Sequence, residues 1–458
     1  MTTEALEPRE EPVRAAFPAH FRFGVAMASY QIEGAVDEDG RGPSIWDAFC
    51  RRPGAVAGGD TGDVACDHYH RWREDLDLMA SLGVESYRFS IAWPRVQPDG
   101  RGALNRAGVD FYRRLAEGLR ERGIEAVATL YHWDLPEARE AAGGWASRDT
   151  ADRFAEYAAL MAAELGDVVD GWITHNEPWV SAFLGHAEGV KAPGVRDWPT
   201  ALRVSHHLLL SHGLAAQALR AGAPGAPVGI TLNLAPVRAA SASAADLAAA
   251  ARMDGHLNRW FLEPLLRGRY PEDMLEQYAR RYGPLETIRA GDLVAIAAPL
   301  DFLGVNYYSP QRVRADPARQ PLELAHVAPP PPTTAMGWEV DPDGLHELLV
   351  QIRREYGDFP IYITENGAAF EDGPVVNGTV EDPRRVEFLS SHLEALGRAI
   401  ADGVDVRRYF AWSMLDNFEW EHGYAKRFGL VYVDYSTQRR VTKRSGLWYR
   451  DFIASARS

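Results

Sequence analysis

The stretch Ile361-Tyr-Ile-Thr-Glu-Asn-Gly367 joins a short apolar segment to a carboxylate and a turn residue. Ile361, Tyr362 and Ile363 are β-branched or aromatic, which favours a buried strand. Glu365 stands at the end of that strand, where a buried carboxylate without a partner would be costly. Many acids at strand ends are caps or members of ion pairs, so this segment alone leaves a structural and a chemical role equally open.

On both sides of this stretch, predicted strands alternate with predicted helices along the chain. Strands are expected at residues 21–29, 86–93, 124–132, 171–176, 227–234, 302–309, 361–365 and 406–414. Helices are expected at residues 69–82, 109–122, 150–165, 199–220, 345–356, 384–402 and 445–454. This alternation fits a closed (β/α)8 barrel better than an open sheet. The predicted fold class is therefore α/β, as a single TIM barrel.

Two connections are longer than a barrel needs. Residues 235–300 are interpreted as extra helices, and residues 310–343, which include four consecutive prolines, as a long loop at the C-terminal face of the strands. The sequence contains no internal repeat and no flexible linker. We therefore expect a disordered acidic tail over residues 1–16 and one catalytic barrel domain over residues 17–458.

Composition and charge argue against several classes of function. The 458 residues carry a formal net charge of −15, which disfavours binding to nucleic acid or to an anionic membrane surface. No run of about 18 apolar residues is present to span a membrane, and residues 1–16 lack the apolar core of a signal peptide. Cys50 and Cys66 allow one disulfide, but two reduced thiols are the simpler interpretation. These features predict a cytoplasmic protein, and the oligomeric state stays open.

TIM barrels place their chemistry at the C-terminal ends of the strands. In this chain, polar and aromatic residues stand at the end of every predicted strand except the fifth. They are Gln31, Glu33, Arg88, His132, Trp133, Asn176, Glu177, Asn306, Tyr307, Tyr308, Glu365, Trp412, Asp416, Glu419 and Trp420. Each one alone is more often a cap or a core residue. Together, two carboxylates among amides and indoles are typical of glycoside hydrolysis. There, one carboxyl protonates the leaving oxygen and the other attacks the anomeric carbon or activates water.

Nine motifs spread over nearly the whole chain resemble glycoside hydrolase family 1, the β-glucosidase family. They are FRFGVAMASYQIEGA (21–35), ACDHYHR (65–71), YRFSIAWPR (87–95), TLYHWDLP (129–136), HNEP (175–178), GVNYYSP (304–310), MGWEVDPDGL (336–345), ITENG (363–367) and AWSMLDNFEWEHGYAKRFGLVYVD (411–434). The two glutamate motifs at this spacing, together with the C-terminal run, make the resemblance specific.

The resemblance implies a role for each matching residue. Glu365 would be the nucleophile that forms a glycosyl-enzyme intermediate, and Glu177 the acid and then the base. Arg88 and Tyr308 would flank Glu365, with Asn306 supporting the cluster around the acid/base. The remaining implied contacts are Asn176 to the sugar 2-hydroxyl, Gln31, His132, Trp133 and Glu419 to the 3-, 4- and 6-hydroxyls, Trp412 as the platform below the ring, Trp420 and Phe428 on the far wall, and Trp338 at the aglycone.

The expected activity is hydrolysis of terminal unphosphorylated β-D-glucosides, with β-galactosidase or β-fucosidase side activity. The substrates would be cello-oligosaccharides or aryl and alkyl β-glucosides. Family members that act on 6-phosphorylated sugars carry a small serine-containing segment and basic residues where this chain has Glu419 and Trp420. Thioglucosidases of the family carry Gln at the position of Glu177. A retaining mechanism also predicts carboxyl groups about 5–5.5 Å apart.

Three other interpretations stay open from the sequence. The intermediate could pass to an alcohol in a transglycosidase, or the barrel could bind sugar without catalysis. A metal-dependent hydrolase is the third, but His68 and His70 lack a third ligand motif, and we expect neither a metal nor a cofactor. His175 stands where the family more usually has an apolar residue, and packing is its favoured role.

Overall fold

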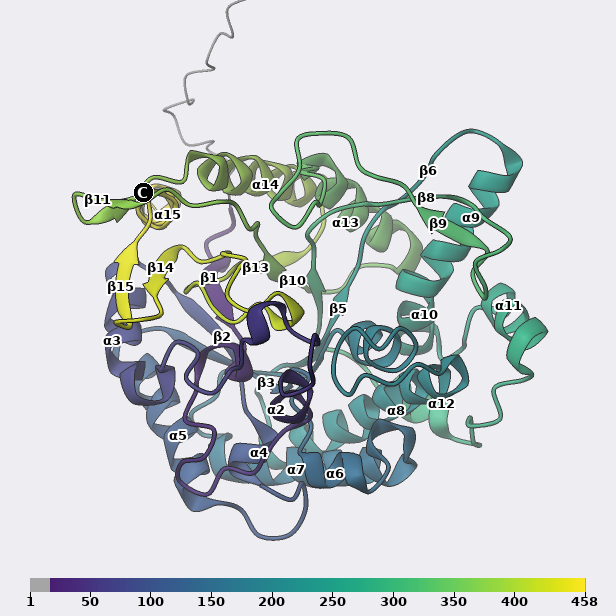
Figure 1. Cartoon of the computed structure of the whole chain (residues 1–458), viewed down its shortest axis with the longest axis horizontal. Coiled ribbons are helices and arrows are strands. Elements are labelled where there is room, and N and C mark those ends of the chain that lie inside the picture. The colour runs from purple at the N-terminus through teal and green to yellow at the C-terminus, as the bar shows by residue number, and fades with distance from the viewer. Residues whose placement is uncertain (1–16, 458) are drawn as a thin grey trace, which may run out of the picture.

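The computed structural model describes residues 17–457 and contains a closed barrel of eight parallel strands (Figure 1). The acidic tail expected over residues 1–16 lies outside the described residues. The barrel strands are β1 (Arg22–Met27), β2 (Ser86–Ser90), β3 (Glu125–Tyr131), β4 (Gly171–Asn176), β5 (Val228–Asn233), β7 (Phe302–Asn306), β10 (Ile361–Asn366) and β13 (Val406–Trp412). They follow one another around the barrel in chain order, and β13 closes onto β1. The predicted (β/α)8 fold is confirmed.

A ring of long helices surrounds the barrel (Figure 1). They are α3 (His68–Ser81), α5 (Arg106–Glu121), α7 (Arg148–Leu165), α8 (Trp198–Gly222), α13 (Pro342–Tyr356), α14 (Pro383–Ala401) and α15 (Arg444–Arg457). Helix α5 shows why they form, because its buried Val109, Tyr112, Ala116 and Leu119 recur every three or four residues and make one apolar face. Within residues 17–457, no helix is both long and apolar enough to cross a membrane.

Shorter helices occupy the connections, and the extra helices predicted over residues 235–300 are present. That insertion holds α9 (Ala244–Asp254), η4 (Gly255–Arg259), α10 (Trp260–Arg267), α11 (Glu272–Tyr282) and α12 (Asp292–Ile296). The other short helices are α1 (Ser29–Ile32), α2 (Ile45–Cys50), η1 (Ala57–Gly59), α4 (Trp93–Val96), α6 (Glu137–Ala141), η2 (Gly144–Ala146), η3 (Val180–Leu184) and η5 (Trp420–His422).

The segment 310–343, expected to be a loop, contains two short strands. β8 (Gln311–Ala315) and β9 (Leu324–His326) join β6 (Val237–Ala239) in a three-stranded sheet beside α9 (Figure 1). Val313 and Leu324 pack on Met253 and Leu257 of the inserted helices. These strands are too short to give a periodic signal, and their pairing depends on an insertion far away in the chain. Two hairpins complete the fold, β11 (Val375–Val376) with β12 (Thr379–Val380) and β14 (Val431–Asp434) with β15 (Arg439–Thr442).

The interior of the barrel is filled below the C-terminal ends of its strands. Val127, Ile173, Phe302 and Tyr362 belong to one buried cluster and come from the first halves of four strands. The rings of Phe302 and Tyr362 stack with centroids 3.9 Å apart. Because side chains fill this half, the barrel is a packed core there and not a pore.

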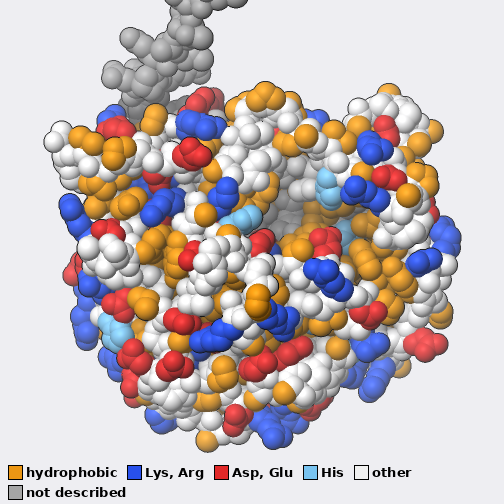
Figure 2. All heavy atoms as spheres, in the orientation of Figure 1, with side chains coloured by type: hydrophobic (Ala, Val, Ile, Leu, Met, Phe, Trp, Pro, Cys, Tyr) orange, Lys and Arg blue, Asp and Glu red, His pale blue; other side chains and the backbone are white. Residues whose placement is uncertain are grey.

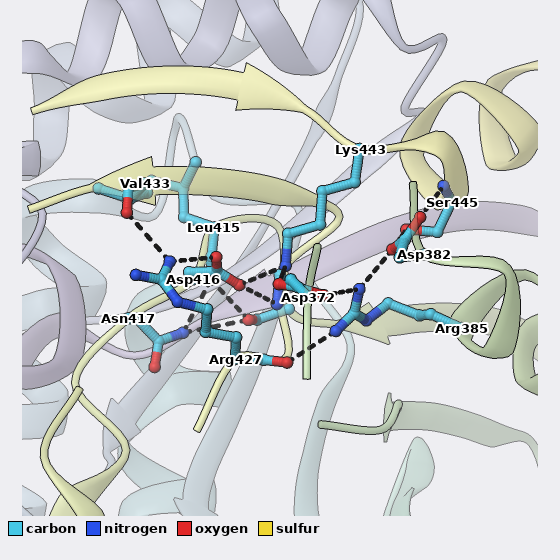
Figure 3. Close-up of polar contacts among 12 residues, drawn as sticks. Asp372, Asp382, Arg385, Leu415, Asp416, Asn417, Arg427, Val433, Lys443 and Ser445 are labelled. Atoms are coloured by element: carbon cyan, nitrogen blue, oxygen red, sulfur yellow. Dashed lines mark hydrogen bonds and ion pairs between the residues drawn. The ribbon is translucent and has the colours of Figure 1, made fainter. Parts of the chain in front are cut away.

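A buried ionic network ties the C-terminal segments to the barrel (Figure 3). The Lys443 ammonium lies 2.5 Å from Asp372 Oδ2 and 2.7 Å from Asp416 Oδ1. Arg427 donates to Asp416 Oδ2 at 2.7 Å, and Arg385 pairs with Asp372 at 3.0 Å. The network links the segments that follow β10 and β13 to α14 and to the end of β15. Asp416, expected at the mouth of the barrel, is therefore a structural residue.

We predict that Lys443→Met destabilises the protein by about 3 kcal/mol or more, because two buried carboxylates lose a shared partner. The measurement is the free energy of unfolding by chemical denaturation at neutral pH. The control is Arg398→Met, which removes a half-exposed partner of Asp343 and should cost less than about 1 kcal/mol. Equal stability of the two variants would contradict this account of the network.

Candidate active site

A pocket of about 270 Å³ opens at the C-terminal ends of the barrel strands. Figure 2 shows this face of the molecule hollowed near its centre. The predicted site residues that line the pocket are His132, Trp133, Glu177, Asn306, Tyr308, Trp338, Glu365, Trp412, Glu419, Trp420 and Phe428. The other three, Gln31, Arg88 and Asn176, are buried. Arg88 and Asn176 hydrogen-bond directly to residues of the lining.

Glu365 faces the pocket because β10 is irregular at its end. The register of β10 against β7 shifts between Ile363 and Glu365, an irregularity that re-aims the side chains beside it. The Glu365 carboxylate is buried and accepts two hydrogen bonds. Arg88 donates to Oε1 at 2.7 Å, and the Tyr308 hydroxyl donates to Oε2 at 2.5 Å. Glu365 thus has a cationic donor on one oxygen and a phenol on the other.

Glu177 lies directly after β4 in a left-handed backbone conformation, with φ of 48°. Non-glycine residues rarely adopt this conformation, and such strain gathers at functional sites. Trp133 and Trp420, which line the same pocket, also have positive φ, at 78° and 48°. The Glu177 carboxyl accepts a hydrogen bond from Asn306 Nδ2 at 2.6 Å, so a neutral amide is its direct partner.

The amide of Asn306 is held in one orientation by two threonines. Thr364 Oγ1 donates to Asn306 Oδ1 at 2.7 Å, and Thr231 Oγ1 donates to Thr364 Oγ1 at 3.2 Å. Asn306 Nδ2 therefore points to Glu177 and also to Asn176 Oδ1, which it reaches at 3.1 Å. The fifth strand, which showed no site residue in the sequence, thus supports the position of Glu177 through Thr231.

Sequence reasoning missed Thr231 and Thr364. Thr364 stands inside the ITENG motif, but strict alternation along a strand would turn it away from the face of Glu365. Thr231 reaches Thr364 because the intervening residue on β7 is Gly304. A Cβ at Gly304 would lie 2.3 Å from Thr231 Oγ1. Close approach of this kind between neighbouring strands leaves no signal in the sequence of either one.

Asn176 connects Arg88 to His132 in the wall of the pocket. Its Oδ1 accepts from Arg88 at 2.6 Å, and its Nδ2 lies 3.0 Å from His132 Nε2. Burial lowers the pKa of His132 well below its ordinary value, so the imidazole is neutral and its Nε2 accepts from the amide.

The surroundings of the two carboxyls favour a proton on Glu177. Burial and the nearby charge of Glu365 together raise the pKa of Glu177 to about 8. Burial also raises the pKa of Glu365, but Arg88 and Tyr308 oppose that rise. Because a guanidinium stabilises a carboxylate far better than an amide does, Glu365 is the one that ionises first. The arrangement provides an acid and an anion within one pocket.

Two buried side-chain oxygens, one directly before η5 and one in α1, accept no hydrogen bond from residues 17–457. They are Glu419 Oε2 and Gln31 Oε1. The Gln31 amide is fixed because Nε2 donates to Asn417 Oδ1 at 3.0 Å and to Phe418 O at 2.8 Å. Burial raises the pKa of Glu419 to about 8, with Lys191 opposing the rise. Such acceptors suit hydroxyl donors of a ligand.

Aromatic side chains form the walls of the pocket. His132 stacks between Trp412 and Trp420, with centroids 5.9 Å from each. Trp133 packs on Trp420 at 4.6 Å. Trp338, predicted at the aglycone, lies 5.2 Å from the Tyr308 ring and 6.1 Å from the Phe428 ring.

Some residues expected at the mouth of the barrel lie elsewhere. Glu33 accepts from Arg95 at 2.8 Å and is a member of a buried ion pair. The Tyr307 hydroxyl donates to the backbone oxygen of Asp341 at 2.6 Å. Asp416 belongs to the ionic network of Lys443. Each is close in the sequence to a residue that lines the pocket, and only the direction of its side chain separates the two groups.

The histidines weighed for other roles have structural partners. His175 is fully buried, hydrogen-bonds to Ser211 and stacks on Phe154 at 4.4 Å, which confirms packing. His68 pairs with Asp75 at 2.8 Å, whereas the exposed His70 contacts other carboxylates. Within residues 17–457, no group of three or more His, Cys, Asp or Glu is placed to hold a metal ion.

Comparison with known proteins places the chain in a family. Residues 13–458 match the model of "Glycosyl hydrolase family 1". "Beta-glucosidase A" of Acetivibrio thermocellus is 47% identical over 96% of this chain and 98% of its own length. A "Bifunctional beta-D-glucosidase/beta-D-fucosidase" of Bifidobacterium breve is 47% identical over 96% of this chain and 98% of its own. The solved structure of a family 1 β-glucosidase from Thermotoga maritima superposes with a TM-score of 0.93 at 47% identity, covering 96% of this chain and 99% of that one. The chain therefore belongs to glycosyl hydrolase family 1.

Proposed function

We propose that the protein is a retaining β-glucosidase that hydrolyses terminal unphosphorylated β-D-glucosides. One observation carries the proposal: Glu177 and Glu365 line the same pocket and have unequal partners. An amide holds Glu177, whereas a guanidinium and a phenol hold Glu365. The names of the related proteins support the same activity. Both carboxyls are present, which argues against a barrel that only binds sugar.

In the first step, Glu365 attacks the anomeric carbon while Glu177 gives its proton to the leaving oxygen. The bond from the anomeric carbon to that oxygen breaks, and an ester to Glu365 forms. Asn176, placed between Arg88 and His132, is suited to hold the 2-hydroxyl, where contacts strengthen in the transition state.

In the second step, Glu177 takes a proton from water, and the resulting oxygen displaces Glu365 from the sugar. Glycosylation removes the negative charge of Glu365, so the pKa of Glu177 falls and its carboxylate can act as the base. We propose water as the acceptor. The alternative of transfer to an alcohol is tested by analysing products in the presence of an acceptor alcohol.

The pocket walls support the proposed contacts to the rest of the sugar. The open acceptors of Gln31 and Glu419, with His132 and Trp133, suit the 3-, 4- and 6-hydroxyls. The indole of Trp412 suits the apolar face of the ring, and Trp420 and Phe428 bound the far side. Trp338 would contact the aglycone of an aryl or alkyl β-glucoside or a cello-oligosaccharide. The same contacts admit β-galactosides and β-fucosides as weaker substrates, in keeping with the name of the Bifidobacterium relative.

We expect 6-phosphorylated sugars to be excluded because the pocket offers their phosphate no free cation, and not because Glu419 repels it. Because the pKa of Glu419 is about 8, its carboxyl is largely neutral at pH 7. A phosphate dianion there would instead be buried without a free cation, since Lys191 is already paired with Glu421 at 2.5 Å. Burying an unpaired charge is costly, so the unphosphorylated sugar is favoured.

We further propose that residues 17–458 act as one catalytic domain in the cytoplasm. Cys50 and Cys66 are both buried free thiols, which fits a reducing compartment.

Glu365→Gly should lower kcat by about a thousandfold or more, because the nucleophile is lost. Azide is small enough to enter the space left by the side chain and should restore turnover, giving α-glucosyl azide. The measurement is hydrolysis of p-nitrophenyl β-glucoside with and without azide. Glu371→Gly, at an exposed site in the segment after β10, is the matched control and should keep activity. Wild-type activity in Glu365→Gly would overturn the assignment.

Glu177→Gln should reduce kcat/KM for an alkyl β-glucoside by about 10²–10⁴-fold, because its leaving oxygen needs a proton. The loss should be far smaller for 2,4-dinitrophenyl β-glucoside, whose leaving group needs none. In the wild type, kcat/KM should fall above pH about 8 as Glu177 loses its proton, and the variant should lack this limb on the activated substrate. Equal losses on the two substrates would exclude Glu177 as the acid.

For substrate choice, we expect kcat/KM to favour p-nitrophenyl β-glucoside over its 6-phosphate by about a hundredfold or more. The comparison uses wild-type protein at pH 6 and pH 7, with the β-galactoside and β-fucoside measured alongside. A preference for the phosphorylated sugar at either pH would show that the pocket supplies a cation to it.

A further inference from the structure

Lys191 is a cation in the pocket wall to which the steps above assign no role in the reaction. It lies between η3 and α8, in the connection that follows β4, and its side chain is 11% exposed. Its ammonium lies 2.5 Å from Glu421 Oε2 and 5.2 Å from the centroid of the Trp133 ring. Glu421 belongs to η5, two residues after Glu419. Lys191 therefore joins two connections, after β4 and after β13, on one side of the pocket.

The balance of charge around the pocket makes this ammonium significant. Four carboxyls line the pocket, those of Glu177, Glu365, Glu419 and Glu421. Among the lining residues within 17–457, Lys191 is the sole lysine or arginine. The guanidinium of Arg88, behind the lining, is already bonded to Glu365 and Asn176. Lys191, although paired with Glu421, thus supplies the positive charge of the pocket lining.

We propose that Lys191, held between Glu421 and the face of Trp133, is a positioning residue that sets the ionisation of Glu177 and Glu419. Through Glu177 it lowers the upper pH limit of the reaction. This inference rests on the proposed function, because it concerns the same acid. The Lys191–Glu421 pair would then do more than join two connections, because it would also influence the charge of Glu177 and Glu419.

The electrostatics of each carboxyl agree with this geometry. Burial raises the pKa of Glu419, and the ammonium of Lys191 is the largest opposing influence. Burial and Glu365 raise the pKa of Glu177, whereas Asn306, Arg88 and, to a smaller extent, Lys191 lower it. Glu421 acts in the opposite sense on Glu419. The other titratable groups that face the pocket are His132, His326 and Tyr308.

Two single substitutions should therefore move the pH profile in opposite directions. Lys191→Met removes a positive charge at similar length, so deprotonation of Glu177 becomes harder and the alkaline limb should rise by about half a pH unit or more. Glu421→Gln leaves Lys191 without its counter-charge, so the same limb should fall. Lys191→Arg should restore the wild-type profile.

The measurement is kcat/KM for p-nitrophenyl β-glucoside between pH 5 and pH 10, with folding checked by circular dichroism. Arg398→Met, on the outer surface, is the charge-matched control and should leave the limb in place. Shifts in the same direction, or no shift in both variants, would overturn the proposal and leave a purely structural pair. The carboxyl titrations can also be followed by ¹³C NMR of glutamate-labelled protein, so a failure of the proposed activity is told apart from a failure of this inference.

Discussion

The guanidinium of Arg88 is the contact on which the rest of the site depends. It is buried and donates to Glu365 Oε1, to the Thr364 backbone oxygen, to Asn176 Oδ1 and to Thr129 Oγ1, at 2.6 to 3.3 Å. Those partners come from β3, β4 and β10, so one side chain of β2 reaches across the barrel. Neither Arg88 nor Glu365 could stay charged and buried without the other, because an unpaired buried ion is strongly destabilising. Closure of the barrel therefore brings Glu365 to the guanidinium that favours its charged form.

The amide of Asn306 gives Glu177 the opposite kind of environment. An amide donates a hydrogen bond to either protonation state of a carboxyl and supplies no charge, so it fixes the position of Glu177 without fixing its ionisation. The ionisation of Glu177 then follows the charges around it, chiefly Glu365. In the proposed mechanism Glu177 is first an acid and then a base, and such an environment allows both states. A cation bonded to Glu177 as Arg88 is to Glu365 would hold it ionised and remove the acid.

The barrel could be predicted from the sequence, and so could the two carboxyls that line its pocket. The side chains that hold those carboxyls in place could not. The barrel strands are buried apolar runs between helices, and each was found within a few residues of its bounds. Glu177 and Glu365 stood out because both follow such runs. Thr231, Thr364 and Lys191 did not, since each acts through a partner far away in the chain. The β6–β8–β9 sheet was missed for the same reason, as its short strands gain their burial from an inserted helix.

The segment after β13 shows why the position of an acid at a strand end does not reveal its role. Asp416 and Glu419 are three residues apart and both buried. Lys443, Arg427 and the Gly429 amide donate to both oxygens of Asp416, so its charge is satisfied within the protein. Glu419 Oε2 has no donor among residues 17–457, and the cost of burying it stays in the free protein. A ligand hydroxyl that donates to Glu419 recovers that cost. A structural acid therefore has hydrogen-bond donors within the protein on both oxygens, whereas an acid suited to a ligand has one oxygen without a donor.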